Sequence, residues 1–103
     1  MLIQEERGNL VTKDKIRAYL LRLFSFHMNV TVEELDNEES FFSLGLTSMI
    51  QTEIHSHLST QVPDLSSVVL FEYPNLDLLT DYLYSQHNDV FLSVSLDEMS
   101  ALT

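Results

Sequence analysis

The chain has 103 residues, of which 45% are hydrophobic and 20% are charged, and its formal net charge at pH 7 is −11. This length and apolar content predict one globular domain and exclude a wholly disordered chain. Cysteine is absent, which excludes disulfide bonds, thiolate zinc sites and cysteine nucleophiles from this sequence. Two glycines and two prolines are too few for a sheet protein with many tight turns, so a helical fold is favoured.

The charges are distributed unevenly along the chain. Residues 1–22 hold all five basic side chains and three acidic ones, a balance of +2, whereas residues 23–103 hold 13 acidic side chains and no basic one. A surface so poor in cations cannot neutralise phosphates, which argues against nucleic acids and anionic membranes as ligands and favours basic protein partners. The sequence has no apolar run of about 18–20 residues for a membrane span. Residues 1–6 lack the pattern of a signal peptide, so a cytoplasmic protein is expected.

Residues 1–11 form a leader without clear periodicity, and the first predicted helix covers residues 13–27. Thr12 is its expected N-cap, and Val11 and Ile16 occupy the two positions of a hydrophobic staple. A long acidic connection follows over residues 29–43. The side chains that recur at helical spacing in the helix are Ile16, Leu20, Leu23, Phe24 and His27, and those expected to hold the connection against the core are Val30, Val32, Leu35, Phe41 and Phe42.

A second helix is predicted over residues 48–60, and Pro63 ends it. Residues 64–71 allow one short helix or turn, and Asn75 is the expected N-cap of a last helix. The inward side chains are Ile50, Ile54 and Leu58 in the second helix and Leu76, Leu79 and Leu83 in the last, where Tyr82 adds aromatic bulk. The expected fold is all-α, a small four-helix bundle with three main helices, one short helix and a long first loop. Its interior is expected to contain Ile16, Leu20, Leu23, Ile54, Leu58, Phe71, Leu79 and Leu83.

Residues 87–103 are interpreted as an acidic amphipathic tail. Ser95 and Glu98 have the spacing of a capping box, and the apolar residues Leu96, Met99 and Leu102 lie around and after it. A helix of about seven residues is marginal alone in water, where roughly 12–15 are needed. The tail is therefore expected to pack on the bundle or to dock on a downstream partner through residues 90–103.

One short stretch, Phe41-Phe42-Ser43-Leu44-Gly45-Leu46-Thr47-Ser48-Met49, is unusual in this chain. Gly45 allows a sharp turn three residues before Ser48, which lies at the predicted start of a helix. The start of a helix presents unpaired amides and a partial positive charge, so a phosphate ester on Ser48 would be favoured there. Taken alone, the stretch is more simply explained by Thr47 or Ser48 acting as an ordinary N-cap.

The surrounding pattern adds to that turn. It contains Phe41 or Phe42, Leu44-Gly45, Ser48-Met49, Glu53-Ile54 and Leu58, then Phe71-x-x-Pro74 and a leucine-rich last helix. Over residues 12–86 this order resembles the acyl carrier protein family, whose pattern is an aromatic residue, Leu-Gly-x-Asp-Ser-Leu, a helix, and Phe-x-x-Pro-Thr. The resemblance implies that Ser48 accepts 4′-phosphopantetheine from coenzyme A through a phosphopantetheinyl transferase. The terminal thiol of that arm would hold acyl groups as thioesters, and the carrier itself would perform no catalysis.

The sequence departs from the family pattern at three positions. Thr47 stands where the family has aspartate, so the carboxylate beside the modification site is missing, although threonine still caps a helix. Asn75 replaces a threonine and Met49 a leucine, both mild changes. The long leader and the acidic tail look most like a carrier of a polyketide synthase, and fatty-acid and peptidyl carriers are the alternative subtypes.

A partner surface is expected around Ser48. The resemblance implies that acidic residues of the second helix and neighbouring loops dock basic patches on the transferase and on acyl-processing synthase enzymes. Glu53 and Glu72 are the expected acidic contacts. The other expected contacts are Thr47, Met49, Ile50 and Thr52.

Other sites are weak or absent in the pattern. Asp36, Glu38 and Ser40 begin like a calcium loop, but the glycine and the final glutamate that such a loop needs are missing. His55 and His57 are two residues apart and point in different directions on a helix, so a shared metal is not expected. No catalytic triad or carboxylate pair emerges from the spacing. The rival interpretation is an acidic helical interaction domain, not an enzyme, in which Ser48 is only a helix cap.

Overall fold

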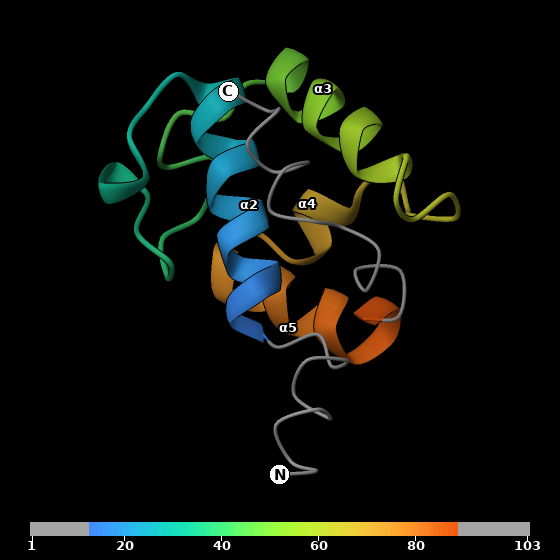
Figure 1. Cartoon of the computed structure of the whole chain (residues 1–103). Coiled ribbons are helices and arrows are strands. Elements are labelled where there is room, and N and C mark those ends of the chain that lie inside the picture. The colour runs from blue at the N-terminus through green and yellow to red at the C-terminus, as the bar shows by residue number, and fades with distance from the viewer. Residues whose placement is uncertain (1–12, 89–103) are drawn as a thin grey trace, which may run out of the picture.

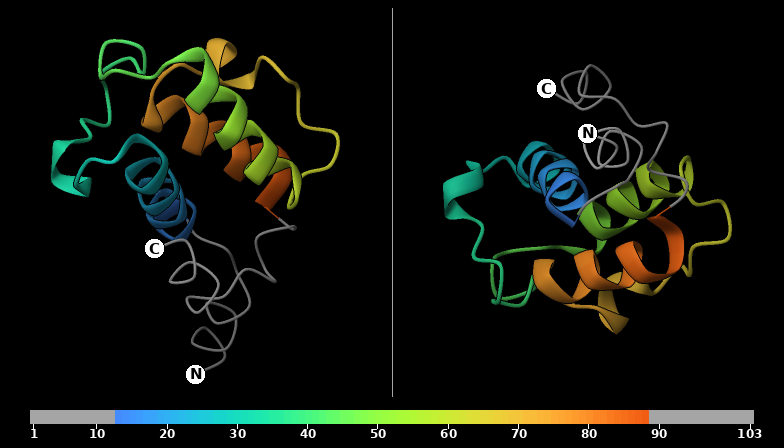
Figure 2. Two further views of the ribbon diagram at one scale, coloured as in Figure 1. Left: turned by 90° about the horizontal axis from the view of Figure 1, so that it is seen from above. Right: turned by 60° about the horizontal axis from the view of Figure 1, so that its bottom comes forward.

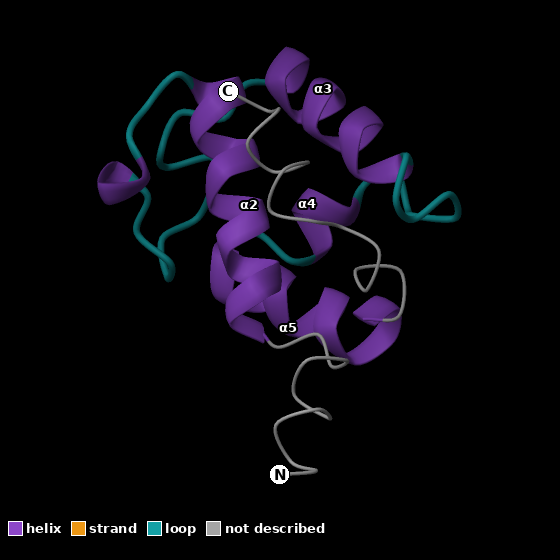
Figure 3. Cartoon of the chain, in the orientation of Figure 1, coloured by secondary structure: helices purple, strands orange, loops and turns teal. Residues whose placement is uncertain are grey.

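The computed structural model describes residues 13–88 and contains helices but no strand within that range (Figure 3). In chain order the elements are α2 (Lys13–Met28), the 3-10 helix η1 (Val32–Glu34), α3 (Ser48–Ser59), the four-residue α4 (Val69–Glu72) and α5 (Leu76–His87). The prediction of an all-α bundle with three main helices, one short helix and a long first loop is confirmed. The leader at residues 1–11, the Thr12 cap with its staple, and the Ser95–Glu98 capping box lie outside the described residues.

Helix α2 is the central element of the bundle, and α5, α3 and η1 all contact it (Figure 1). Its buried side chains recur at spacings of three and four residues, which places them on one face: Ile16, Tyr19, Leu20, Leu23 and Phe24. The helix ends at Met28. The next residue, Asn29, has a φ of 59° in the left-handed region, and the Val30 amide donates to the Ser25 carbonyl at 3.2 Å. This is the hydrogen bond of a Schellman motif, so the helix stops for a local reason.

The three longer helices surround a shared interior (Figure 2). The expected core residues of α2, α3 and α5 are fully buried, and the loops contribute Leu35, Phe41, Leu46, Val62 and Leu65. Phe41 stacks on Phe24 with 4.3 Å between the ring centroids, and its amide donates to the Pro74 carbonyl at 2.8 Å. The long loop is thus fixed to the bundle through a buried aromatic side chain rather than crossing it freely.

Three side chains that were expected to be buried are exposed. Phe71 is 57% exposed because α4 has only four residues and Val69 and Leu70 occupy its inward positions, so the next residue turns outward. Phe42 is 36% exposed because its neighbour Phe41 takes the core position. Val32 is 37% exposed at the start of η1, a single turn that buries none of its side chains.

Within the described part of the chain, no helix has the length and apolar character that crossing a membrane requires.

Candidate functional site

The turn before α3 is built by backbone hydrogen bonds and one glycine. The Gly45 amide donates to the Phe42 carbonyl at 3.2 Å, and the Leu46 amide donates to the Phe41 carbonyl at 3.0 Å. Gly45 has a φ of +109°, a conformation that side-chain-bearing residues rarely adopt, and an added Cβ would meet no atom within 4 Å. The glycine is therefore required by backbone conformation rather than by lack of space.

Thr47, and not Ser48, is the N-cap of α3. Its Oγ1 accepts a hydrogen bond from the Ile50 amide at 3.2 Å, and its carbonyl accepts from the Gln51 amide at 2.8 Å. Ser48 is the first residue with helical conformation. The interpretation of Ser48 as only a helix cap is therefore wrong, because the neighbouring threonine fills that role.

The Ser48 side chain is exposed at the start of α3. Among residues 13–88 no group hydrogen-bonds Ser48 Oγ, although the Ser48 carbonyl accepts from Thr52 Oγ1 at 3.0 Å. The first amides of a helix have no acceptor within the helix, and α3 has no acidic residue in its first turn. A phosphate diester on Ser48 Oγ would meet the positive end of the helix dipole without a competing carboxylate on that turn. These features fit a phosphate-linked group.

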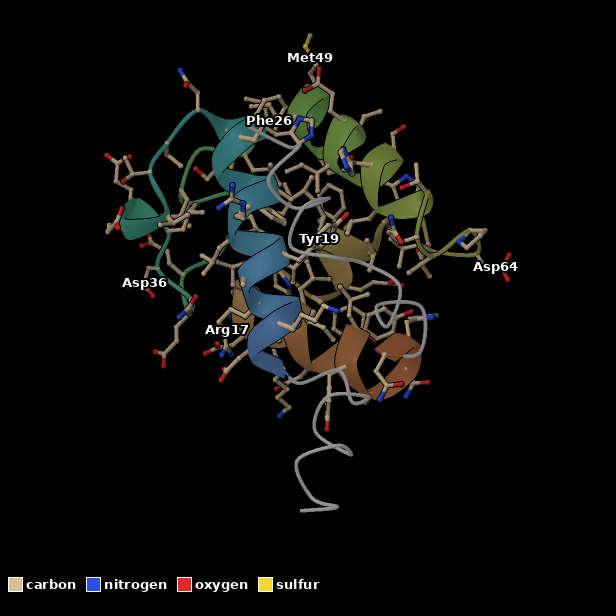
Figure 4. All side chains as sticks on the ribbon, in the orientation of Figure 1. Arg17, Tyr19, Phe26, Asp36, Met49 and Asp64 are labelled. Atoms are coloured by element: carbon tan, nitrogen blue, oxygen red, sulfur yellow. The ribbon has the colours of Figure 1, made fainter. Side chains whose placement is uncertain are left out.

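The expected partner residues are brought together only in part. Met49 is 71% exposed and projects away from the body at the start of α3 (Figure 4), and Thr52 is exposed on the next turn. Ile50 turns inward and packs against the core, which leaves little of it for a partner. Glu53 lies 3.5 Å from His27 Nδ1 on α2, and Glu72 is exposed at the end of α4, a different helix.

Gln51 is a residue of this region that the sequence did not single out. Its side chain is only 8% exposed, and Nε2 donates to the Ser67 carbonyl at 3.0 Å, which ties α3 to the segment leading into α4. The buried positions of α3 are Gln51, Ile54 and Leu58. A polar residue three positions before Ile54, on the apolar face, was the available signal.

Three exposed apolar side chains gather beside α3. The Phe42 ring from the turn stacks on the Phe71 ring from α4, with 4.8 Å between their centroids and an interplanar angle of 22°. Val68 lies one turn before Phe71 and is 47% exposed. We call Phe42, Val68 and Phe71 the apolar shelf.

A group of two histidines and one carboxylate joins the end of α2 to α3. The His27 and His57 rings meet edge to face with 5.8 Å between their centroids, and Glu53 contacts His27. Burial, and secondly the charge of His27, hold the pKa of His57 below its usual value. Among the described residues no three histidine, aspartate or glutamate side chains form a metal-binding group. The calcium-loop residues and the His55–His57 pair therefore have no such arrangement in this part of the chain.

Comparison with known proteins gives one family and one relative. The family model described as "Phosphopantetheine attachment site" matches residues 18–83, which contain all of α3, α4 and the turn between α2 and α3. The chain is 27% identical over 71 residues to the polyketide synthase PksL of Bacillus subtilis (strain 168). That alignment covers 68% of this chain but only 2% of the length of the relative. No solved structure matches the chain significantly.

Proposed function

Because this chain belongs to the family of phosphopantetheine-attachment carrier domains, which are not catalytic, we propose that Ser48 is the residue that carries the arm. The observation that supports this most strongly is that Thr47 and Ser48 have different roles at the start of α3. Thr47 supplies the cap, and the Ser48 hydroxyl is left exposed with no hydrogen-bond partner among the described residues. Two other serine hydroxyls nearby are engaged: Ser40 Oγ accepts from the Phe42 amide, and Ser66 Oγ accepts from the Val68 amide.

The proposed attachment is a phosphoryl transfer from coenzyme A. Ser48 Oγ forms a bond to the phosphorus that bears the pantetheine, and the bond from that phosphorus to the bridging oxygen of the pyrophosphate breaks. The hydroxyl proton passes to a base of the phosphopantetheinyl transferase, and adenosine 3′,5′-bisphosphate leaves. The resulting diester carries one negative charge at the first turn of α3, where the helix dipole stabilises it. The attached arm supplies a terminal thiol on which acyl groups are held as thioesters.

The proposed cargo is an acyl intermediate of polyketide biosynthesis. The similarity to a polyketide synthase supports this subtype, and fatty-acid and peptidyl cargo are the alternatives. The proposed organisation is a leader at residues 1–11, the carrier domain at residues 12–86, and a tail at residues 87–103 that docks a downstream partner. The proposed partners are the transferase and synthase enzymes whose basic surfaces meet Glu53 and Glu72.

Intact mass spectrometry tests the attachment residue. After incubation with coenzyme A and a broad-specificity phosphopantetheinyl transferase, the protein should gain one phosphopantetheinyl group. Ser48→Ala should gain none, whereas Ser56→Ala, which removes another exposed serine of the same helix, should be modified as the wild type is. Modification of Ser48→Ala would overturn the assignment. So would unmodified wild-type protein, if Thr47→Asp, which restores the family's carboxylate, also stayed unmodified.

The cargo is tested by the mass of the acyl group on protein purified from its own cells. A β-keto or partly reduced, oxygen-bearing chain is expected for a polyketide carrier. A fully saturated chain would indicate a fatty-acid carrier, and an aminoacyl group a peptidyl carrier. Removal of residues 90–103 should lower acyl transfer to the downstream partner, and unchanged transfer would contradict the proposed role of the tail.

A further inference from the structure

The surface beside Ser48 lacks charge in a protein that is otherwise strongly acidic. Residues 41–52 and residues 65–71 contain no charged side chain, although one residue in five of the whole chain is charged. The two segments are adjacent in space because α3 contacts α4 and the Gln51 side chain donates to the Ser67 carbonyl. Ion pairs therefore cannot be the main contact of a partner that covers these two segments.

Apart from Met49, the side chains of the apolar shelf are the most exposed apolar side chains in this uncharged region. Phe71 is 57% exposed, Val68 47% and Phe42 36%. The stacked pair of rings joins the turn before α3 to the short helix α4, so the shelf is held in place from both segments. Grouped exposed apolar side chains of this kind mark interaction sites, because leaving them in water has an unfavourable free energy.

Helix geometry places the shelf on the Ser48 side of α3. Successive residues of an α-helix are rotated by about 100°, so Ser48 lies about 60° from Gln51 around the helix and Met49 about 160° from it. Gln51 points toward the segment before α4, since it hydrogen-bonds Ser67. Ser48 therefore faces the side of α3 on which the shelf lies, and Met49 faces the opposite side.

We propose that the apolar shelf is a docking surface for the phosphopantetheinyl transferase, which meets it with apolar side chains of its own. The inference rests on Ser48 as the attachment residue. The transferase must bring phosphorus within bonding distance of Ser48 Oγ itself, so it must cover the surface next to that atom. Later enzymes act on the group at the far end of the arm, so they need not cover Ser48 Oγ. Because the shelf has no charge, its complement on the transferase is apolar.

The carboxylates affect the rate at which the transferase associates, whereas the shelf affects the lifetime of the complex. Glu72 follows directly after Phe71 and borders the shelf, whereas Glu53 lies on the side of α3 that faces His27 of α2. Border charges raise the rate of encounter with a basic partner, and salt screens this effect. Apolar contacts buried on docking lengthen the life of the complex, and salt in the range up to about 0.5 M does not screen them.

The test compares exposed apolar side chains on opposite parts of the bundle. Phe71→Ser removes the most exposed ring of the shelf, and Leu78→Ser removes a side chain of α5 that is 45% exposed. With a broad-specificity transferase, kcat/KM should fall about tenfold or more for Phe71→Ser at both low and high salt, because a buried aromatic contact is lost. Leu78→Ser should match the wild type, and Phe71→Leu should retain most of the activity. Glu53→Gln should lower kcat/KM at low salt only.

Several results would overturn the inference. If the wild type is modified and Phe71→Ser reacts with unchanged kcat/KM, the shelf is not the docking surface. The shelf is also not the docking surface if the loss of kcat/KM in Phe71→Ser disappears at high salt, or if Leu78→Ser shows the same loss. Circular dichroism and thermal unfolding check that each variant is folded, and Phe42→Ala, which removes the other ring of the shelf, carries the test if Phe71→Ser is not folded. A wild-type dimer that Phe71→Ser dissociates would assign the shelf to a second copy instead. Failure of the wild type to react would overturn the Ser48 assignment itself.

Discussion

Helix α2 meets α5 through charges, whereas α3 meets α4 without any. Lys13 Nζ lies 3.0 Å from an Asp81 oxygen, and Arg17 donates to Asp77 at 2.8 Å. On the other side, Gln51 Nε2 donates to the Ser67 carbonyl, His55 Nε2 lies 3.1 Å from the Leu65 carbonyl oxygen, and the two rings of the apolar shelf stack. Every basic side chain of residues 13–88 lies on α2.

The α2–α5 side is therefore held together by charges within the fold, and the α3–α4 side is the one that we propose meets partners. The α2–α5 side has partners for its charges within the fold. The α3–α4 side carries exposed apolar side chains and the free Ser48 hydroxyl. The transferase must bind the carrier and release it after the transfer, which an uncharged shelf of modest size, with Glu72 at its border, would permit.

The largest expected effect comes from the pair of adjacent aromatic residues in the loop. Phe41 is fully buried and stacks on Phe24, whereas Phe42 is partly exposed and belongs to the shelf. Phe41→Ala should lower the free energy of unfolding by about 3–5 kcal/mol. Phe42→Ala should lower it by about 1 kcal/mol, mainly through loss of the stack with Phe71. Urea unfolding of the two variants measures both values.

Phe41→Ala and Phe42→Ala also distinguish a loss of stability from a loss of recognition by the transferase. Phe42→Ala should slow modification by the transferase more than its small loss of stability explains, because the protein remains folded. Phe41→Ala should affect modification only through the folded fraction. Equal losses of stability in the two variants would contradict the assignment of Phe41 to the core and Phe42 to the surface.

The contrast between Phe41 and Phe42 also shows where sequence reasoning fails. Helical spacing correctly predicted the buried stripes of α2 and α5, because 12 to 16 residues give several turns of periodic signal. A turn and a four-residue helix give none. The sequence therefore placed Phe42 and Phe71 against the core, although both point to solvent and stack on each other.

In the candidate site, too, local sequence signals predicted some features and missed others. The glycine turn, the position of Ser48 and the Asn75 cap were predictable from local signals, and the structure has Asn75 Oδ1 accepting from the Leu78 amide at 2.8 Å. The hydrogen bond between Gln51 and Ser67 joins residues 16 positions apart, and no local pattern encodes such a contact. The choice of Thr47 over Ser48 as the cap was also open, since both side chains are good caps.

A smaller effect is expected from the helix caps. Thr47→Ala removes the hydrogen bond to the Ile50 amide and should lower the free energy of unfolding by about 1 kcal/mol. Thr47→Asp keeps an acceptor at the cap and should stay within about 0.5 kcal/mol of the wild type. Denaturant unfolding measures these changes.

Asn75→Ala is the matched control on α5. It removes the cap bond to Leu78 and a longer bond from Asn75 Nδ2 to the Glu38 carbonyl at 3.3 Å, so it should destabilise the fold at least as much. Only Thr47→Ala should also alter the rate of modification, because Ser48 can replace the lost cap and its hydroxyl is then engaged. A stable Thr47→Ala with normal modification would show that the cap bond contributes little.

The smallest expected effect is a pH dependence that arises where α2 meets α3. Burial, followed by the charge of His27, lowers the pKa of His57 in the folded protein below the 6.5 of the unfolded chain. Below about pH 6.5 the unfolded chain therefore binds this proton more readily than the folded one, so stability falls as pH falls toward the folded pKa. Above pH 7 the histidine is neutral in both states and contributes no slope.

His57→Gln should flatten the decline in stability between about pH 6.5 and the folded pKa, and should leave the dependence above pH 7 unchanged. His27→Gln should remove only part of the decline, because burial of His57 remains the larger cause. It also removes the contact between His27 Nδ1 and the Glu53 carboxylate at 3.5 Å. Urea midpoints measured at intervals from pH 5 to pH 8 test both variants. An unchanged slope in His57→Gln would contradict the assignment of this pH dependence to His57.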